Sequence, residues 1–178
     1  MSKVPPRLRV ATLNIHKGLS HFNRRLTVHE IGERLTALGT DIVFLQEVQG
    51  GHARHASRFQ HWPGKCQTEF LAGKVYPEFV YGKNCVYDMG HHGNAILSRY
   101  KILCWENEDI SAHAFESRGM LHCEIEVPGI AEPVHCINVH LGLTESGRKR
   151  QLGMIVARIR SMVPESAPLI LAGDFNDW

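Results

Sequence analysis

Two segments of this chain present the same features in the same order, and this internal repeat is the strongest constraint on its fold. The first segment begins with alternating apolar and polar residues and reaches an N-x-H-x-G pattern at residues 14–18. It continues as a helix-like stretch and ends in an apolar run that closes on Glu47. The second segment has N-x-H-x-G at residues 138–142, another helix-like stretch and an apolar run that closes on Asp174.

The repeat predicts where polar side chains gather. A strand, a helical crossover and a second strand form a parallel pair whose carboxyl ends meet at one edge of a sheet. Each half should therefore bring an asparagine, a histidine and a carboxylate to one edge, and two packed sheets would bring the halves to one cleft. Oxygen ligands suit Mg²⁺ or Mn²⁺, and imidazoles suit phosphate contacts or proton transfer. A single acid or histidine at a strand end is usually a cap or a surface group, so the prediction depends on their mirrored order.

Hydrophobic periodicity predicts an α/β fold of alternating strands and helices. Strands are expected at residues 7–16, 41–47, 94–98, 120–127, 134–141 and 169–175, and helices at about 28–38 and 147–162. Thr27 and Glu30 have the spacing of a capping box at the start of the first helix, and Gly39 supplies its end. Residues 49–93 lack clear periodicity, so we expect mainly loops there, with a short helix or strand at most.

Length and composition limit the class of protein. The 178 residues suit one domain, by the usual prior of about 150 residues. The net charge of +2 argues against strong non-specific binding to DNA. No apolar stretch approaches the ~18 residues of a membrane span, and the first residues lack the apolar core of a secretion signal. The five cysteines include no C-x-x-C and are typical of reduced thiols. We therefore expect a cytoplasmic protein without a transmembrane segment, and infer no obligate protein partner.

Five segments in this order, TLNIHKG, LQE, GNAILSR, NVHLG and GDFN, resemble the endonuclease/exonuclease/phosphatase superfamily of metal-dependent phosphoesterases. The strings HHGNAILSRY and GDFNDW are similar to those of an uncharacterised bacterial subfamily. The resemblance covers nearly the whole chain. It implies a four-layer α/β sandwich, in which two mixed β-sheets pack together with helices outside. It also implies a hydrolase, a phosphodiesterase or phosphatase, that uses Mg²⁺ or Mn²⁺.

The resemblance implies roles for individual residues. Asn14 and Glu47 match metal-binding positions, with Glu47 as the principal direct ligand. Asp174 matches the residue that orients or deprotonates the attacking water, and Asn176 matches the partner that holds this water or a phosphate oxygen. His140 matches a contact to the scissile phosphate. Three further residues match substrate- or phosphate-binding positions less closely, namely His16, Asn94 and Arg118.

Two of these less close matches, Arg118 and His16, fit the family pattern less well. Arg118 either meets phosphate or pairs with Glu116 or another acid. Nuclease-type members often have an acid where this chain has His16, which makes it less similar to the repair nucleases.

The implied mechanism is in-line attack by water on a phosphoester. The substrate is a small phosphodiester, a phospholipid head group or a nucleic acid. Two alternatives remain: a DNA or RNA endo- or exonuclease, and a catalytically inactive domain that binds a metal or a partner.

The last residues of the sequence bear on activity. Members of the superfamily carry a further Asp and a Ser-Asp-His motif in their last third, and this sequence ends at Trp178 without that motif. We therefore expect residues 1–178 to form a single truncated domain, with the sandwich incomplete at its C-terminus. Such a chain is expected to bind metal but to show little or no hydrolysis.

Overall fold

Two four-stranded mixed sheets organise the chain. The computed structural model describes residues 7–64, 66–73 and 75–177. The first sheet contains, in spatial order, β1 (Val10–Asn14), β2 (Ile42–His52), β4 (Gly90–Ser98) and β3 (Glu78–Tyr87). The second contains β5 (Ile102–Asp109), β6 (Gly119–Ile125), β7 (Val134–His140) and β8 (Leu169–Asp174).

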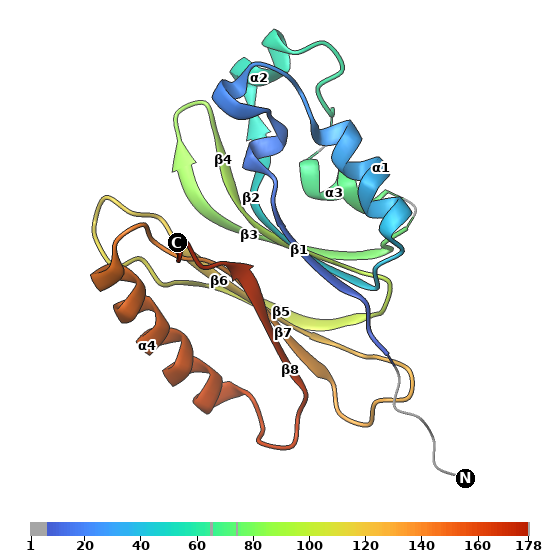
Figure 1. The fold of residues 1–178 in the computed structure, drawn as a ribbon, viewed down its shortest axis with the longest axis vertical. Helices are drawn as coiled ribbons and strands as arrows, with labels where there is room; N and C mark the ends of the chain where they lie inside the picture. The colour runs from blue at the N-terminus through green and yellow to red at the C-terminus, as the bar shows by residue number, and fades with distance from the viewer. Residues whose placement is uncertain (1–6, 65, 74, 178) are drawn as a thin grey trace.

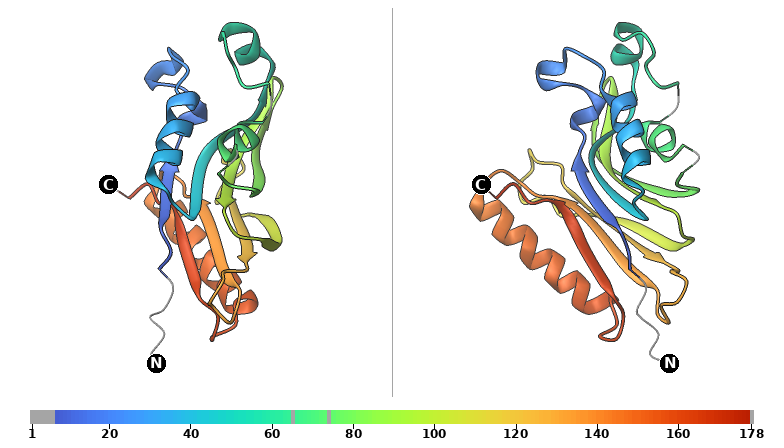
Figure 2. Two further views of the ribbon diagram at one scale, coloured as in Figure 1. Left: turned by 90° about the vertical axis from the view of Figure 1, so that its right-hand side faces the viewer. Right: turned by 45° about the vertical axis from the view of Figure 1, so that its right-hand side comes forward.

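Helices cover the outer faces of both sheets (Figure 1). The first sheet is covered by α1 (Val28–Leu38) and α3 (Gln67–Ala72), and the second by α4 (Glu145–Met162). The short helix α2 (Ala53–Arg58) follows β2, and the 3₁₀ turns η1 (His16–Gly18) and η2 (His21–Asn23) follow β1. Helix, sheet, sheet and helix form four layers, which follow one another from α4 to α1 in Figure 1 and in the right view of Figure 2. The predicted α/β sandwich is confirmed.

The internal repeat corresponds to two parallel crossovers. In the first half β1 pairs with β2 in parallel through α1, and in the second β7 pairs with β8 in parallel through α4. The halves differ in register at their acidic ends. Asn138 lies opposite Ala172, two residues before Asp174, whereas Asn14 lies opposite Gln46, one residue before Glu47.

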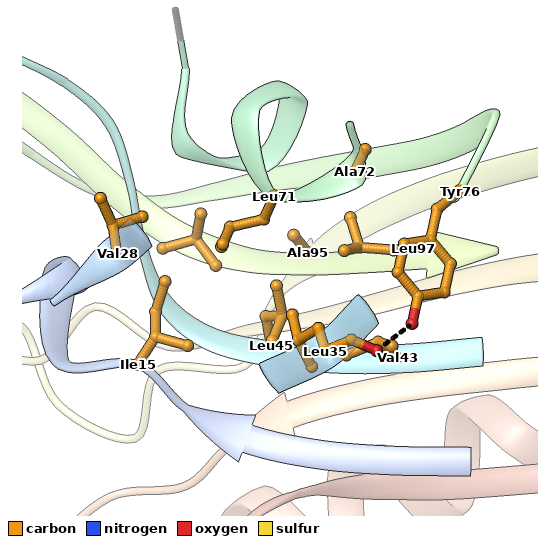
Figure 3. Close-up of a cluster of buried hydrophobic side chains, with 11 residues drawn as sticks. Ile15, Val28, Leu35, Val43, Leu45, Leu71, Ala72, Tyr76, Ala95 and Leu97 are labelled. Carbon is orange, nitrogen blue, oxygen red and sulfur yellow. Dashed lines mark hydrogen bonds between the residues drawn. The ribbon is translucent and has the colours of Figure 1, made fainter. Parts of the chain in front are cut away.

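Alternating side chains divide the apolar core into three layers. Val43 and Leu45 pack outward against α1 and α3, in the cluster shown in Figure 3, where the Tyr76 hydroxyl donates to the carbonyl of Leu35 over 3.4 Å. Their neighbours Ile42 and Phe44 point inward and meet the second sheet. A third cluster lies between the second sheet and α4. Burial on both faces explains the continuous apolar run of β2.

One polar side chain joins the two sheets inside this core. Asn138 of β7 is fully buried. Its amide nitrogen donates to the carbonyl oxygens of Leu45 at 2.9 Å and Ala95 at 2.8 Å. Its amide oxygen accepts from Nε2 of Gln46 at 2.7 Å. A buried amide requires such partners, because each unpaired group costs about 1–3 kcal/mol.

Two predictions from the sequence were wrong. Residues 49–93 contain the end of β2, the helices α2 and α3, all of β3 and the start of β4. Glycines and histidines interrupt the apolar alternation by which strands are recognised in a sequence, so these strands were not predicted. The capping box was also wrong, because Thr27 makes no side-chain cap and Glu30 pairs with Arg25 instead. Gly39 ends α1 in a left-handed conformation, as predicted.

No helix in the part of the chain that the structure describes is long and apolar enough to cross a membrane.

Two glycines give opposite predictions for stability. Gly173 of β8 has a φ of +152°, and a Cβ there would collide with the carbonyl oxygen of Val139. Gly173→Ala should therefore lower the free energy of unfolding by about 1–3 kcal/mol. Gly153 lies inside α4 with nothing near its Cβ position, so Gly153→Ala should raise this free energy by up to about 1 kcal/mol. Urea denaturation of both variants measures the difference, and equal effects would contradict the close approach of β8 to β7.

Candidate active site

Glu47 reaches the edge of the first sheet through a break in strand pairing. The register of β2 against β4 shifts between Leu45 and Val48, and Glu47 within this bulge has a φ of +53°. Few non-glycine residues adopt that conformation, and a bulge redirects the side chain it contains. The carboxylate consequently leaves the core and faces the ends of β1 and β8.

Asn14, at the end of β1, joins the acids of the two halves. Its amide nitrogen donates to Oε1 of Glu47 at 3.2 Å and to Oδ2 of Asp174 at 2.9 Å. Its amide oxygen accepts the backbone N–H of His16 at 3.0 Å. These contacts fix the amide orientation, so that nitrogen rather than oxygen faces the carboxylates. The predicted gathering of both halves at one edge is therefore seen for these three side chains.

Cationic and imidazole groups surround Glu47. Lys17 Nζ lies 3.2 Å from its Oε2, and Nδ1 of the half-exposed His16 lies 3.6 Å from the same oxygen. Burial alone would raise the pKa of Glu47, but the Lys17 ammonium and the hydrogen bond from Asn14 outweigh it and lower the pKa. The carboxylate is therefore ionised at neutral pH and available to a cation.

Asp174 is held from three sides at the end of β8. Oδ1 accepts the backbone N–H of Asn176 at 3.1 Å, and Nε2 of His140 lies 3.7 Å from Oδ2, the oxygen that Asn14 contacts. The side chain of Asn176 is buried, and its nitrogen donates to the carbonyl of Leu141 at 2.7 Å. Asn176 thus orients Asp174 through its backbone and anchors the turn after β7 through its side chain.

Arg118 completes the cluster on the side of the second sheet. Its Nη1 lies 3.3 Å from Nδ1 of His140. A guanidinium can only donate, so Nδ1 accepts and the neutral imidazole carries its proton on Nε2, toward Asp174. Burial and the nearby Arg118 lower the pKa of His140, against the opposing effects of Asp174 and Glu47. Arg118 also pairs with Glu116 at 3.7 Å, which is the second of the two sequence alternatives for this residue.

Strained backbone concentrates at these residues. His16, Lys17, Glu47 and Asn176 all have positive φ values between 47° and 59°. Such conformations cost free energy and persist where the surrounding structure requires them, often at functional sites. Four of them within one cluster of charged and polar groups support a functional role for it.

Asn94 lies apart from this cluster. It is buried between the sheets, and its amide nitrogen donates to the carbonyls of Gly119 at 3.0 Å and Asn138 at 3.4 Å. The structure thus gives Asn94 a bridging position like that of Asn138, inside the core.

Two hollows border this end of the molecule. One of about 460 Å³ is bounded by Asn14 and Asp174. A larger one of about 790 Å³ lies beside α2, is lined by residues 49–53, 57–64 and 66–67, and includes neither carboxylate. Asp174 and Asn14, the partner of Glu47, line the smaller hollow, so we associate the candidate site with it.

A family model described as the endonuclease/exonuclease/phosphatase family matches residues 11–178 of this chain. The chain belongs to the endonuclease/exonuclease/phosphatase family. Among curated proteins it is 45% identical over 170 residues to the uncharacterized protein YbhP of Escherichia coli K12, an alignment that covers 96% of this chain and 67% of YbhP.

Solved structures share the fold of this chain. An endonuclease/exonuclease/phosphatase from Beutenbergia cavernae superposes with a TM-score of 0.73 at 23% identity, over 96% of this chain and 48% of that protein. The mannosyl-6-phosphatase Bt3783 of Bacteroides thetaiotaomicron gives 0.70 at 16% identity, over 96% and 66% of the two chains. The chain thus spans about half the length of the Beutenbergia protein. Family members are hydrolases that act on phosphoesters, and they generally use divalent metals.

The donor set at Glu47 fits a hard divalent cation with few protein ligands. Among the described residues, no three His, Cys, Asp or Glu side chains form a ready metal cluster. Mg²⁺ in proteins often takes one or two carboxylates and completes its shell with water and phosphate oxygens. The ionised Glu47 can supply such a ligand, while Asn14 in the observed orientation holds the carboxylates rather than the metal.

Lys17 lies at the candidate site although sequence reasoning gave it no role, and His92 lies beside the same groups. Lys17 follows the N-x-H pattern directly, and its contact with Glu47 depends on the tight turn η1. His92 of β4 feels the charges of Lys17, Glu47 and Arg118, and the sequence signal was only its position before the GNAILSR segment. A histidine pair in a glycine-rich stretch does not reveal which ring faces the acids.

The buried histidines predict that acid destabilises the fold. Burial, with Lys17 nearby, lowers the pKa of His92 from 6.5 to about 4, and the pKa of His140 is lowered as well. As the pH falls below about 6.5, the unfolded chain binds protons that the folded chain does not, so the free energy of unfolding decreases. Urea denaturation between about pH 7.5 and 4.5 measures this dependence, to which the lowered pKa of Glu47 adds only near the acid end.

A matched pair of variants isolates the contribution of His92. His92→Gln should flatten the pH dependence, whereas His21→Gln, in an exposed turn away from these groups, should leave it unchanged. A fold whose stability is constant or rises toward pH 4.5 would contradict the assignment of neutral histidines.

Proposed function

We propose that this chain provides the metal-binding and water-orienting part of a divalent-metal-dependent phosphoester hydrolase acting by in-line attack of water. The observation that supports this most directly is the shared Asn14 amide, which places the carboxylates of Glu47 and Asp174 beside one another from opposite halves of the fold. Family membership supports the class of reaction, and the geometry supports the roles proposed below. The proposed substrate is a phosphodiester or phosphomonoester.

Glu47 is the proposed ligand of Mg²⁺ or Mn²⁺. When bound, the ion would neutralise charge on the phosphate oxygens and on the leaving group. Asn14 keeps the Glu47 carboxylate in place, and the bulge of β2 directs it out of the core. Lys17 occupies one carboxylate oxygen and is free to turn toward a phosphate, because its side chain retains 29% exposure.

Asp174 is the proposed group that orients the attacking water and accepts its proton. One of its oxygens is held by the backbone N–H of Asn176, and the other by Asn14. With 28% of its side chain exposed, the carboxylate still reaches solvent beside the hollow. A general base needs both this fixed direction and access to the nucleophile.

His140 and Arg118 are the proposed phosphate contacts. The neutral imidazole offers its Nε2–H on the side of Asp174, and Arg118 adds a permanent positive charge behind it. Preorganised donors of this kind stabilise charge that develops on phosphate oxygens in the transition state. His16 contacts the outer oxygen of Glu47 and is half-exposed, so we assign it to the rim of the site.

Metal binding and phosphoester turnover test the two carboxylates separately. Mn²⁺ binding, followed by the loss of the free-ion paramagnetic resonance signal, should be abolished by Glu47→Gln and retained by Asp174→Asn. On a panel of nucleotide, sugar and glycerol phosphoesters, any Mg²⁺-dependent hydrolysis should fall at least about 100-fold in either variant.

The exposed carboxylate of Glu33 on α1 provides the matched control. Glu33→Gln should change neither Mn²⁺ binding nor turnover. Hydrolysis that persists in EDTA, or Mn²⁺ binding that survives Glu47→Gln, would contradict the proposed roles. Cleavage of DNA or RNA in preference to small esters would select the nuclease alternative. Metal binding without turnover of any phosphoester agrees with the little or no hydrolysis expected of residues 1–178, and the loss of Mn²⁺ binding in Glu47→Gln then carries the test.

A further inference from the structure

Glu116 and Gln151 lie behind the candidate site, and neither has an assigned role. Glu116 belongs to the loop between β5 and β6, residues 110–118. This loop is closed at its base, because the N–H of Ile110 donates to the carbonyl of Arg118 at 2.9 Å and the N–H of Arg118 donates to Oγ of Ser111 at 2.9 Å. The backbone of Arg118 is therefore fixed, but its long side chain needs further contacts to take one direction.

The Glu116 carboxylate supplies one of these contacts. Its Oε1 lies 3.7 Å from Nε of Arg118, while its Oε2 accepts the N–H of Ala112 at 3.1 Å and Nε2 of Gln151 at 2.9 Å. Both members of the ion pair are largely buried, with 17% exposure for Glu116 and 19% for Arg118. An ion pair held by additional hydrogen bonds has a defined geometry, unlike a pair of mobile surface chains.

Gln151 connects this carboxylate to the turn after β7. It comes from α4, is fully buried, and its Oε1 accepts the N–H of Gly142 at 2.8 Å. A Cβ at Gly142 would collide with the Glu116 carboxylate, so the glycine permits the carboxylate to lie against this turn. Sequence analysis placed Gly142 in the internal repeat, and the structure shows what the glycine accommodates.

Together with the contacts of Asp174, these hydrogen bonds and ion pairs form a closed ring, called here the circuit, that includes His140. From Asp174 the circuit passes through Asn176 to the carbonyl of Leu141, the residue after His140. It continues from Gly142 through Gln151 and Glu116 to Arg118, and returns through His140 to Asp174. Every polar group in the circuit restricts the next, and His140 is the member that faces both Arg118 and Asp174.

We propose that Glu116 and Gln151 are positioning residues that hold Arg118 against Nδ1 of His140, and thereby keep the imidazole proton on Nε2, toward Asp174. The proposal deepens the proposed function, because it explains how the phosphate contact receives its direction. The positioning itself is a property of the folded chain without metal or substrate. It can therefore be tested whether or not the chain hydrolyses phosphoesters.

The sign of a shift in the pKa of His140 separates positioning from simple charge. The charged or titratable groups that act on His140 are Arg118, Asp174, Glu47, Lys17 and His92. If Glu116 holds Arg118 in place, Glu116→Gln releases the guanidinium, and the pKa of His140 rises by about half a unit or more. If Glu116 acts only as a negative charge, its removal lowers the pKa of His140, because less negative charge then favours the imidazolium.

NMR titration of the histidine ring protons in EDTA-treated protein measures this pKa, with His140→Gln used to assign the signal. Arg118→Gln should raise the pKa of His140 similarly, and Glu116→Gln combined with Arg118→Gln should add little to Arg118→Gln alone, because both act through one contact. Glu106→Gln is the matched control, since Glu106 pairs with Arg158 elsewhere on the second sheet, and it should leave His140 unchanged.

Gln151→Met provides a second variant that leaves the charge of Glu116 in place. It should raise the pKa of His140 in the same direction, and long-range ¹H–¹⁵N spectra should show a mixture of imidazole tautomers where the wild type shows the Nε2–H form. An unchanged or lowered pKa in both Glu116→Gln and Gln151→Met, with the tautomer preserved, would overturn the proposal. Neither readout involves turnover, so a failure of the proposed function would leave this result intact.

Discussion

The hydrogen bonds of Asn138 fix the relation between the two sheets, and the site depends on that relation. This fully buried amide contacts Gln46 and two carbonyls of the first sheet from within β7 of the second. Gln46 immediately precedes Glu47, and His140 lies two residues after Asn138. A shift of one sheet over the other would break the hydrogen bonds of this buried amide to the first sheet, and this cost holds the register. The acid of one half and the histidine of the other are therefore aligned by a core interaction.

The carboxylates of Glu47 and Asp174 create an electrostatic problem that the neighbouring groups solve. Two like charges at the same edge repel each other, and burial increases the cost of each. The shared amide of Asn14 donates to both, Lys17 places a positive charge on Glu47, and Arg118 places another beyond His140. Because each acid has only a few partners, its carboxylate oxygens remain accessible to a cation and to water.

The sequence predicted the parts of this site that follow from strand order, and missed those that follow from turn geometry. The two N-x-H-x-G patterns and the apolar runs located Asn14, Glu47, His140 and Asp174, because parallel crossovers bring such positions to one edge. Periodicity could not predict the bulge that turns Glu47 outward, nor the left-handed turn that carries Lys17 to it. Nor could it show that Asn94 lies inside the core, since an asparagine at the start of a predicted strand has the same pattern whether it faces solvent or a buried carbonyl.

The repeated halves have diverged in the use of equivalent residues. Asn14 joins two carboxylates at the open edge, whereas Asn138 joins two sheets inside the core. In both cases an amide crosses between halves, which a carboxylate could not do without unpaired charge and an apolar side chain could not do at all. The amide donates and accepts at once, so it can satisfy an acid on one side and a backbone group on the other. Asn138 therefore holds the two sheets together, whereas Asn14 orients the two carboxylates of the candidate site.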